Sequence, residues 1–69
     1  MSSTIHIGSI IRDELRRQGK TNAWFAKEIN VNTRTVNKIF LKDVFDTHQL
    51  LLISQALGVD FFKYYSELL

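Results

Sequence analysis

The chain has 69 residues, of which 45% are hydrophobic, and it carries a formal net charge of +2 at pH 7 with no cysteine. A chain this short forms a single domain with a modest core. Without cysteine, neither disulfide bonds nor thiolate zinc sites can brace the fold. No run approaches the ~18 apolar residues that a membrane-spanning helix needs, so we expect a soluble, cytoplasmic protein with no membrane partner.

The charge is unevenly distributed. Residues 1–42 contain eight Lys or Arg and three acidic residues, a net charge of +5, whereas residues 43–69 contain one Lys and four acidic residues, a net charge of −3. This asymmetry favours a polyanionic partner that faces one end of the molecule. An ordinary solvated surface can show the same bias, so the charge distribution alone leaves both interpretations open.

Residues 1–6 are expected to form a flexible N-terminal arm, and a first helix is predicted over 7–18. The apolar stripe of this helix consists of Ile7, Ile10, Ile11 and Leu15. Gly19 follows it, where a left-handed helix cap belongs. Asp13 and Arg17 are four residues apart in this helix, a spacing that predicts a weak ion pair.

A short helix, a tight turn and a second helix are predicted over 21–41. Their apolar positions, at helical spacing, are Phe25, Ile29, Val31, Val36 and Ile39. Thr21 and Asn32 each stand where a side chain can cap the helix that follows. Ala26 lies where the two helices would cross, since a small side chain lets the backbones approach. Asn30 falls at the reversal, and Asn tolerates a left-handed backbone.

The surface left on the second of these helices is hydrogen-bonding and cationic, with no acidic residue; it consists of Thr33, Arg34, Asn37 and Lys38. This combination argues for a helix laid in the major groove of DNA. Arg34 can donate two hydrogen bonds to guanine, Asn37 can pair with adenine, and Thr33 can touch a thymine methyl. Lys38 can reach guanine or a phosphate. The alternative is a solvated polar face.

The flanks of this helix offer further contacts to the DNA backbone. Thr35 is expected to point to the side, near a phosphate, and Lys42 can also reach a phosphate. The segment 40–45 is unusually apolar for a loop. We therefore expect either Val44 or Phe45 to fill the core beneath the next helix.

A fourth helix is predicted over 47–57, capped by Asp46 or Thr47 and ended by Gly58. A last helix is predicted over 61–68, and apolar side chains surround it almost completely. Such a helix either wraps over the first helix or packs against a second copy. We predict a homodimer interface made of Phe61, Phe62, Tyr65, Leu68 and Leu69. A two-fold dimer would place two recognition helices ~34 Å apart, one DNA turn.

Residues 22–41 resemble the helix-turn-helix of phage repressors of the Cro/XRE-like type. The matching positions are Phe25, Ala26, Ile29, Asn30, Val31, Val36 and Ile39. The family usually has Gly where this chain has Asn30, and a polar residue where it has Trp24. The resemblance implies an all-α, five-helix, lambda-repressor-like DNA-binding domain over 7–69, with the helix-turn-helix at its second and third helices.

The resemblance also implies contacts to DNA phosphates near the end of the first helix and the start of the second. The residues at those places are Arg16, Arg17, Lys20 and Asn22. The family often has Gln at the position of Asn22, and Asn is shorter by one methylene. A solubilising surface is the alternative for the three cations.

Catalysis finds no support in the sequence. His6 and His48 are far apart, and we see no nucleophile arrangement, glycine-rich phosphate loop or metal-ligand cluster, so we predict neither enzyme activity nor a cofactor. We expect sequence-specific binding of double-stranded DNA by a small transcriptional regulator, such as a repressor. The alternative is a helical protein-interaction module, antitoxin-like or an adaptor, whose apolar C-terminal helix grips a protein partner.

Overall fold

Five helices and no strand make up residues 5–69, the part of the chain that the structure, a computed structural model, describes. The helices are α1 (Ile7–Arg17), α2 (Asn22–Glu28), α3 (Thr33–Phe40), α4 (Thr47–Leu57) and α5 (Lys63–Ser66). They confirm the prediction of an all-α, five-helix chain. Of the predicted arm, residues 1–4 lie outside the described part. Within residues 5–69, no helix has the length and apolar character needed to cross a membrane.

The helix starts follow from local hydrogen bonds. The side chains of Thr21, Asn32 and Asp46 each accept a bond from the backbone N–H three residues ahead, at 2.7–3.0 Å. Each bond satisfies one of the N–H groups that a helix N-terminus leaves without a partner. At the other end, Gly58 closes α4 in the left-handed conformation, with φ at 66°. The predicted caps at Thr21, Asn32, Asp46 and Gly58 are therefore confirmed.

The start of α1 differs from the expected arm. Ile5 is half-buried and packs against the core. Nδ1 of His6 lies 3.2 Å from the backbone nitrogen of Ser9, from which it accepts, and 2.7 Å from the Ser9 hydroxyl oxygen. His6 is thus the N-cap of α1, and the prediction of an arm is wrong for residues 5 and 6.

The last helix is shorter than predicted. Only Lys63–Ser66 is helical, and Asp60 accepts from the Phe62 N–H at 3.0 Å in a turn that precedes the helix. Phe61 is completely buried among core residues of its own chain, and its N–H lies 3.4 Å from the Ser54 hydroxyl. Phe61 therefore offers no surface to a second copy, and its place in the expected interface is corrected.

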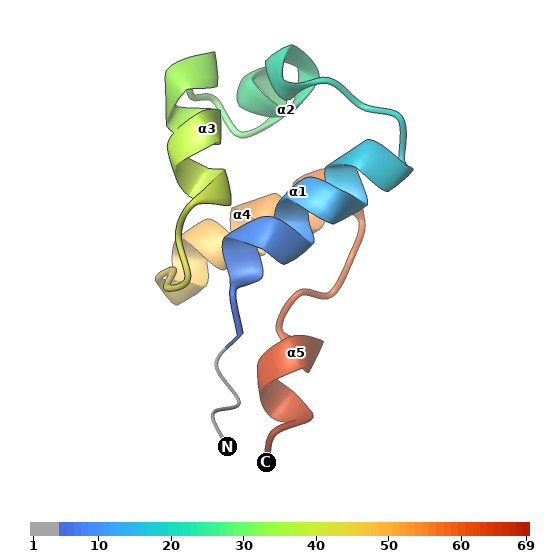
Figure 1. Cartoon of the computed structure of the whole chain (residues 1–69), viewed down its shortest axis with the longest axis vertical. Helices are drawn as coiled ribbons and strands as arrows, with labels where there is room; N and C mark the ends of the chain where they lie inside the picture. Colours follow the sequence, from blue (N-terminus) through green and yellow to red (C-terminus); the bar gives the residue numbers. More distant parts are fainter. Residues whose placement is uncertain (1–4) are drawn as a thin grey trace.

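The core gathers around α1, which crosses the middle of the molecule with α2 and α3 at one end of the long axis and α5 at the other (Figure 1). The buried apolar residues are Ile7, Ile11, Leu15, Phe25, Ala26, Val36, Ile39, Phe40, Leu50, Ile53, Leu57 and Phe61. The rings of Phe25 and Phe40 lie parallel, 6.4 Å between centroids, and so join α2 to α3. The buried residues of α1 belong to the same core cluster as those of α2 and α3.

Gly8 lies in close contact with the backbone at the end of α3. Its N–H donates to the Lys42 carbonyl at 2.9 Å. A Cβ at this position would lie 2.5 Å from the carbonyl oxygens of Ile39 and Lys42 and 2.7 Å from that of Phe40. Only glycine permits this approach of two backbones. The position of α3 therefore depends on a residue in the first turn of α1.

Candidate nucleic-acid interface

The turn between α2 and α3 sets the angle at which α3 leaves the core. Asn30 adopts a left-handed backbone with φ at 60°, as predicted. The Val31 N–H then donates to the Ala26 carbonyl at 2.8 Å, and Asn32 caps the next helix. α2 and α3 meet at the end of the molecule remote from α5 (Figure 1). The first turn of α3 is thereby exposed at this end.

One side of α3 is buried and the opposite side is open. Val36, Ile39 and Phe40 face the core. The four predicted base contacts, Thr33, Arg34, Asn37 and Lys38, are all exposed. Three of them line a shallow hollow together with Asn32. Thr35 is half-buried at the flank. The helix contains no acidic residue, so this face combines hydrogen-bond donors with positive charge.

Three predicted contacts from three helices form a hydrogen-bonded series, here called the Arg16–Asn22–Asn37 relay. Arg16 Nη1 donates to Asn22 Oδ1 at 3.1 Å, and Asn22 Nδ2 donates to Asn37 Oδ1 at 3.4 Å. The Arg16 guanidinium also lies 5.9 Å from the centroid of the Phe40 ring. The relay joins a predicted base contact to two predicted phosphate contacts. Sequence spacing gives no signal for it, because its members become neighbours only when the helices pack.

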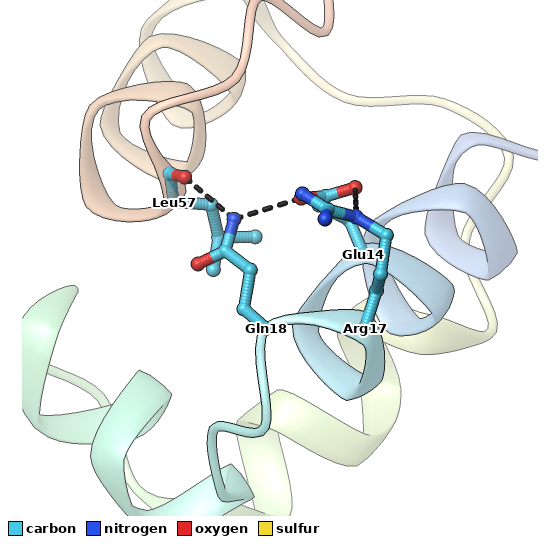
Figure 2. Close-up of polar contacts among 4 residues, drawn as sticks. All are labelled: Glu14, Arg17, Gln18 and Leu57. Atoms are coloured by element: carbon cyan, nitrogen blue, oxygen red, sulfur yellow. Dashed lines mark hydrogen bonds and ion pairs between the residues drawn. The ribbon is translucent and has the colours of Figure 1, made fainter.

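Arg17 is placed differently from Arg16. Its guanidinium binds both carboxylate oxygens of Glu14, rather than the predicted Asp13, which lies 3.5 Å from Arg12 instead. The Gln18 amide donates to Glu14 and to the Leu57 carbonyl, each at 2.8 Å, and so ties α1 to the end of α4 (Figure 2).

These contacts change how the two ionised groups titrate. The hydrogen bond from Arg17, followed by that from Gln18, lowers the pKa of Glu14 from 4.5 to about 2. The same hydrogen bond raises the pKa of Arg17. The structure therefore gives Arg17, whose side chain is 71% exposed, a carboxylate partner and does not bring it into the relay, and its expected phosphate contact stays a prediction.

The other two cations among the predicted phosphate contacts, Lys20 and Lys42, lie over aromatic rings. The Lys20 ammonium is 4.9 Å from the centroid of Trp24, beside the start of α2. The Lys42 ammonium is 4.7 Å from the centroid of Phe45 and donates to Gln49 at 3.2 Å. Phe45 packs against the core, whereas Val44 is exposed, which decides between the two alternatives for this loop. Both lysines are exposed, one shortly before α2 and the other shortly after α3. The exposed side of these two helices and their flanks is here called the α2–α3 surface.

Among residues 5–69, no three His, Cys, Asp or Glu side chains come close enough together to hold a metal ion. The sequence matches no protein-family model, and comparison with curated proteins and with solved structures gives no significant match. What this surface binds is therefore inferred from its own geometry and charge.

Proposed function

We propose that the protein is a sequence-specific DNA-binding protein, a small transcriptional regulator of the lambda-repressor-like helix-turn-helix kind, that inserts α3 into the major groove. The observation that supports this proposal most is the open face of α3. Thr33, Arg34, Asn37 and Lys38 are all exposed there on a helix without acidic residues. Groove-reading helices present such donors from their first turns.

Arg34 carries the strongest base contact in this proposal. Its side chain is exposed beside the hollow near the start of α3. Arginine donates a fork of two hydrogen bonds that matches guanine O6 and N7, and a good pair of this kind contributes about 1–3 kcal/mol of discrimination. Thr33 lies next to it for a thymine methyl or a base acceptor.

The DNA backbone contacts in this proposal come from residues around α3. They are Arg16, Lys20, Asn22, Thr35 and Lys42. The N-terminus of α2, where Asn22 lies, also presents N–H groups that suit a phosphate. Each phosphate that a cation neutralises adds about 0.9 to the slope of log affinity against log salt concentration. Binding is therefore expected to weaken steeply as salt rises.

We also propose that two copies pair through the end of the molecule that carries α5. Tyr65, Leu68 and Leu69 are exposed there and Phe62 is half-buried. This end lies opposite α2 (Figure 1), so pairing leaves the open face of α3 uncovered in both copies. Sedimentation of the wild type and of Leu68→Asp tests it, with a dimer expected only for the wild type. A wild type that stays monomeric at high concentration favours the alternative, in which a different protein covers these side chains.

The central experiment is selection of bound duplexes from a random pool, followed by titration of the selected duplex. The wild type is expected to enrich a defined sequence. Arg34→Ala is expected to lose preference at a guanine and to bind at least about fivefold more weakly, from the lower bound of such a contact. Lys63→Ala removes the same charge on α5 and is expected to bind like the wild type. A folded wild type that enriches no sequence and binds no duplex at low salt would sink the proposal.

A further inference from the structure

The Arg16–Asn22–Asn37 relay ends on the face of α3 that we propose reads DNA. Asn37 is exposed and lines the hollow beside Thr33 and Arg34. We infer that the relay fixes which end of the Asn37 amide faces the groove, and that Asn37 thereby selects hydrogen-bond acceptors on base edges. This inference rests on the proposed function and specifies the bases that one position of the site takes.

The direction of the relay is set by its first member. Arginine carries only donors, whereas an asparagine amide carries a donor at one end and an acceptor at the other. The end of Asn22 that meets Arg16 at 3.1 Å is therefore Oδ1, which leaves Nδ2 beside α3. A donor at that place requires an acceptor from Asn37, whose Oδ1 lies 3.4 Å away. Asn37 consequently turns its oxygen inward and its NH2 group outward.

This orientation changes the base contact expected of Asn37. Asparagine binds adenine by a pair of hydrogen bonds that needs its oxygen and its NH2 group directed at the same base. With the oxygen held by Asn22, only the NH2 group is directed outward. Its partners in the major groove are the acceptors guanine O6 and N7, thymine O4 and adenine N7, whereas the amino groups of adenine and cytosine are donors and do not match.

Phosphate binding by Asn22 reinforces the same orientation. The NH2 group of Asn22 has two hydrogens, and one of them is directed to Asn37. The second is left for a phosphate oxygen, an acceptor that also requires nitrogen at this end of the amide. Contact with the DNA backbone at the start of α2 and base choice at Asn37 are therefore coupled through one side chain.

The test uses Asn22→Asp to reverse donor and acceptor in the hydrogen bond between residues 22 and 37. A carboxylate offers only acceptors, so one oxygen keeps the bond from Arg16 while the other accepts from the NH2 group of Asn37. Asn37 then turns its oxygen toward the groove. Selection from a random pool is expected to shift the preference at one position away from guanine and thymine, which present only acceptors, and toward cytosine or adenine, which present an amino donor, by about fivefold or more in relative affinity. Overall affinity also falls, because the new carboxylate repels phosphate.

Two further variants identify the base pair that Asn37 contacts and test the relay without adding a carboxylate near the DNA. Asn37→Ala is expected to lose base preference at that one position and to keep it at the position read by Arg34. Arg16→Met removes the donor that orients Asn22, so preference at the Asn37 position is expected to relax at least about threefold while the rest of the site is kept. Circular dichroism and thermal melting establish that every variant is folded.

The inference is overturned if the recognition lost in Asn37→Ala depends on the amino group of an adenine or a cytosine, as its removal from the duplex would show, because the wild-type Asn37 oxygen then contacts that donor. It is also overturned if Arg16→Met and a DNA-binding Asn22→Asp both keep the wild-type preference there. Failure of the proposed function looks different, because the folded wild type then enriches no sequence at all. The wild type and the three variants can be measured side by side on the same four duplexes, which differ only at this base pair.

Discussion

Two neighbouring arginines at the end of α1 belong to different regions of the molecule. Arg16 faces α2 and α3, where it meets a neutral amide and an aromatic ring. Arg17 belongs to the junction of α1 with α4, where it binds the carboxylate of Glu14. A neutral partner orients a guanidinium and leaves its charge available to a polyanion, whereas a carboxylate neutralises it. The positive charge that this surface offers to a polyanion therefore depends on whether each Lys or Arg has an acidic partner, and not on the number of such residues alone.

The largest effect is expected from a change at Gly8, which packs α1 against the end of α3. Gly8→Ala puts a Cβ within 2.7 Å of three backbone carbonyl oxygens at the end of α3, so α3 has to move away from α1. Overpacking of this kind costs about 1–3 kcal/mol and sometimes more. We expect the melting temperature to fall by roughly 5–20 °C, since 1 kcal/mol shifts a domain of this size by about 4–8 °C. Calorimetry measures the shift.

The control for Gly8→Ala is Gln55→Ala, on the exposed face of α4. It is expected to leave the melting temperature within a few degrees of the wild type, because surface substitutions usually change stability by about 0.5 kcal/mol or less. Equal shifts in the two variants would show that the close approach of α1 and α3 is not required.

The N-caps of α3 and α4 are expected to contribute equally to stability and differently to DNA binding. Asn32→Ala and Asp46→Ala each remove one N-cap bond, from α3 and from α4 respectively. Each loss typically costs about 1 kcal/mol, so the two variants should be similarly destabilised. DNA binding should weaken further in Asn32→Ala alone, because this residue starts the proposed recognition helix. Chemical denaturation and DNA titration of both variants, below their unfolding midpoints, measure the two effects.

Local features were predictable from the sequence because donor and acceptor lie within one helical turn. The caps at Thr21, Asn32 and Asp46 and the left-handed Asn30 are of this kind, and so is the division of α3 into buried and open sides. The spacing of its buried side chains is enough to place the exposed ones. Four exposed members of the candidate site follow from that spacing alone.

Features that depend on packing between distant segments were not predictable. The need for glycine at position 8 arises from the carbonyl groups of a segment far along the chain. The apolar residues after Asp60 could either continue a helix or fill the core. Phe61, the first of them, is buried in the core. Arg17 had acidic residues at two helical spacings, and Glu14 is the one it binds.

Salt dependence tests the difference between the two arginines directly. Arg16→Ala removes a cation with no acidic partner on the α2–α3 surface, so the slope of log affinity against log salt should fall by about 0.9. Arg17→Ala removes a cation already neutralised by Glu14, and its slope should match that of the wild type. Titrations of one duplex at several salt concentrations measure both. Equal decreases in the two variants would contradict the assignment of Arg17 to the α1–α4 junction.

The smallest expected effect is the contribution of the α1–α4 junction to stability in acid. The folded chain lowers the pKa of Glu14 from 4.5 to about 2, so folding favours its ionised form. The stabilisation is fully present above about pH 4.5 and is lost as pH falls toward 2. Because Arg17 is largely exposed, solvent screening limits it to about 1 kcal/mol or less.

Replacing the carboxylate isolates this contribution. Glu14→Gln should be less stable than the wild type at neutral pH, and the gap should close between pH 4.5 and about 2. Glu28→Gln, the matched change on α2, should keep the wild-type slope through this range. Urea denaturation at steps of pH measures the difference. A gap that persists at pH 2 would mean that Glu14 acts through packing, and that its charge contributes nothing to the junction.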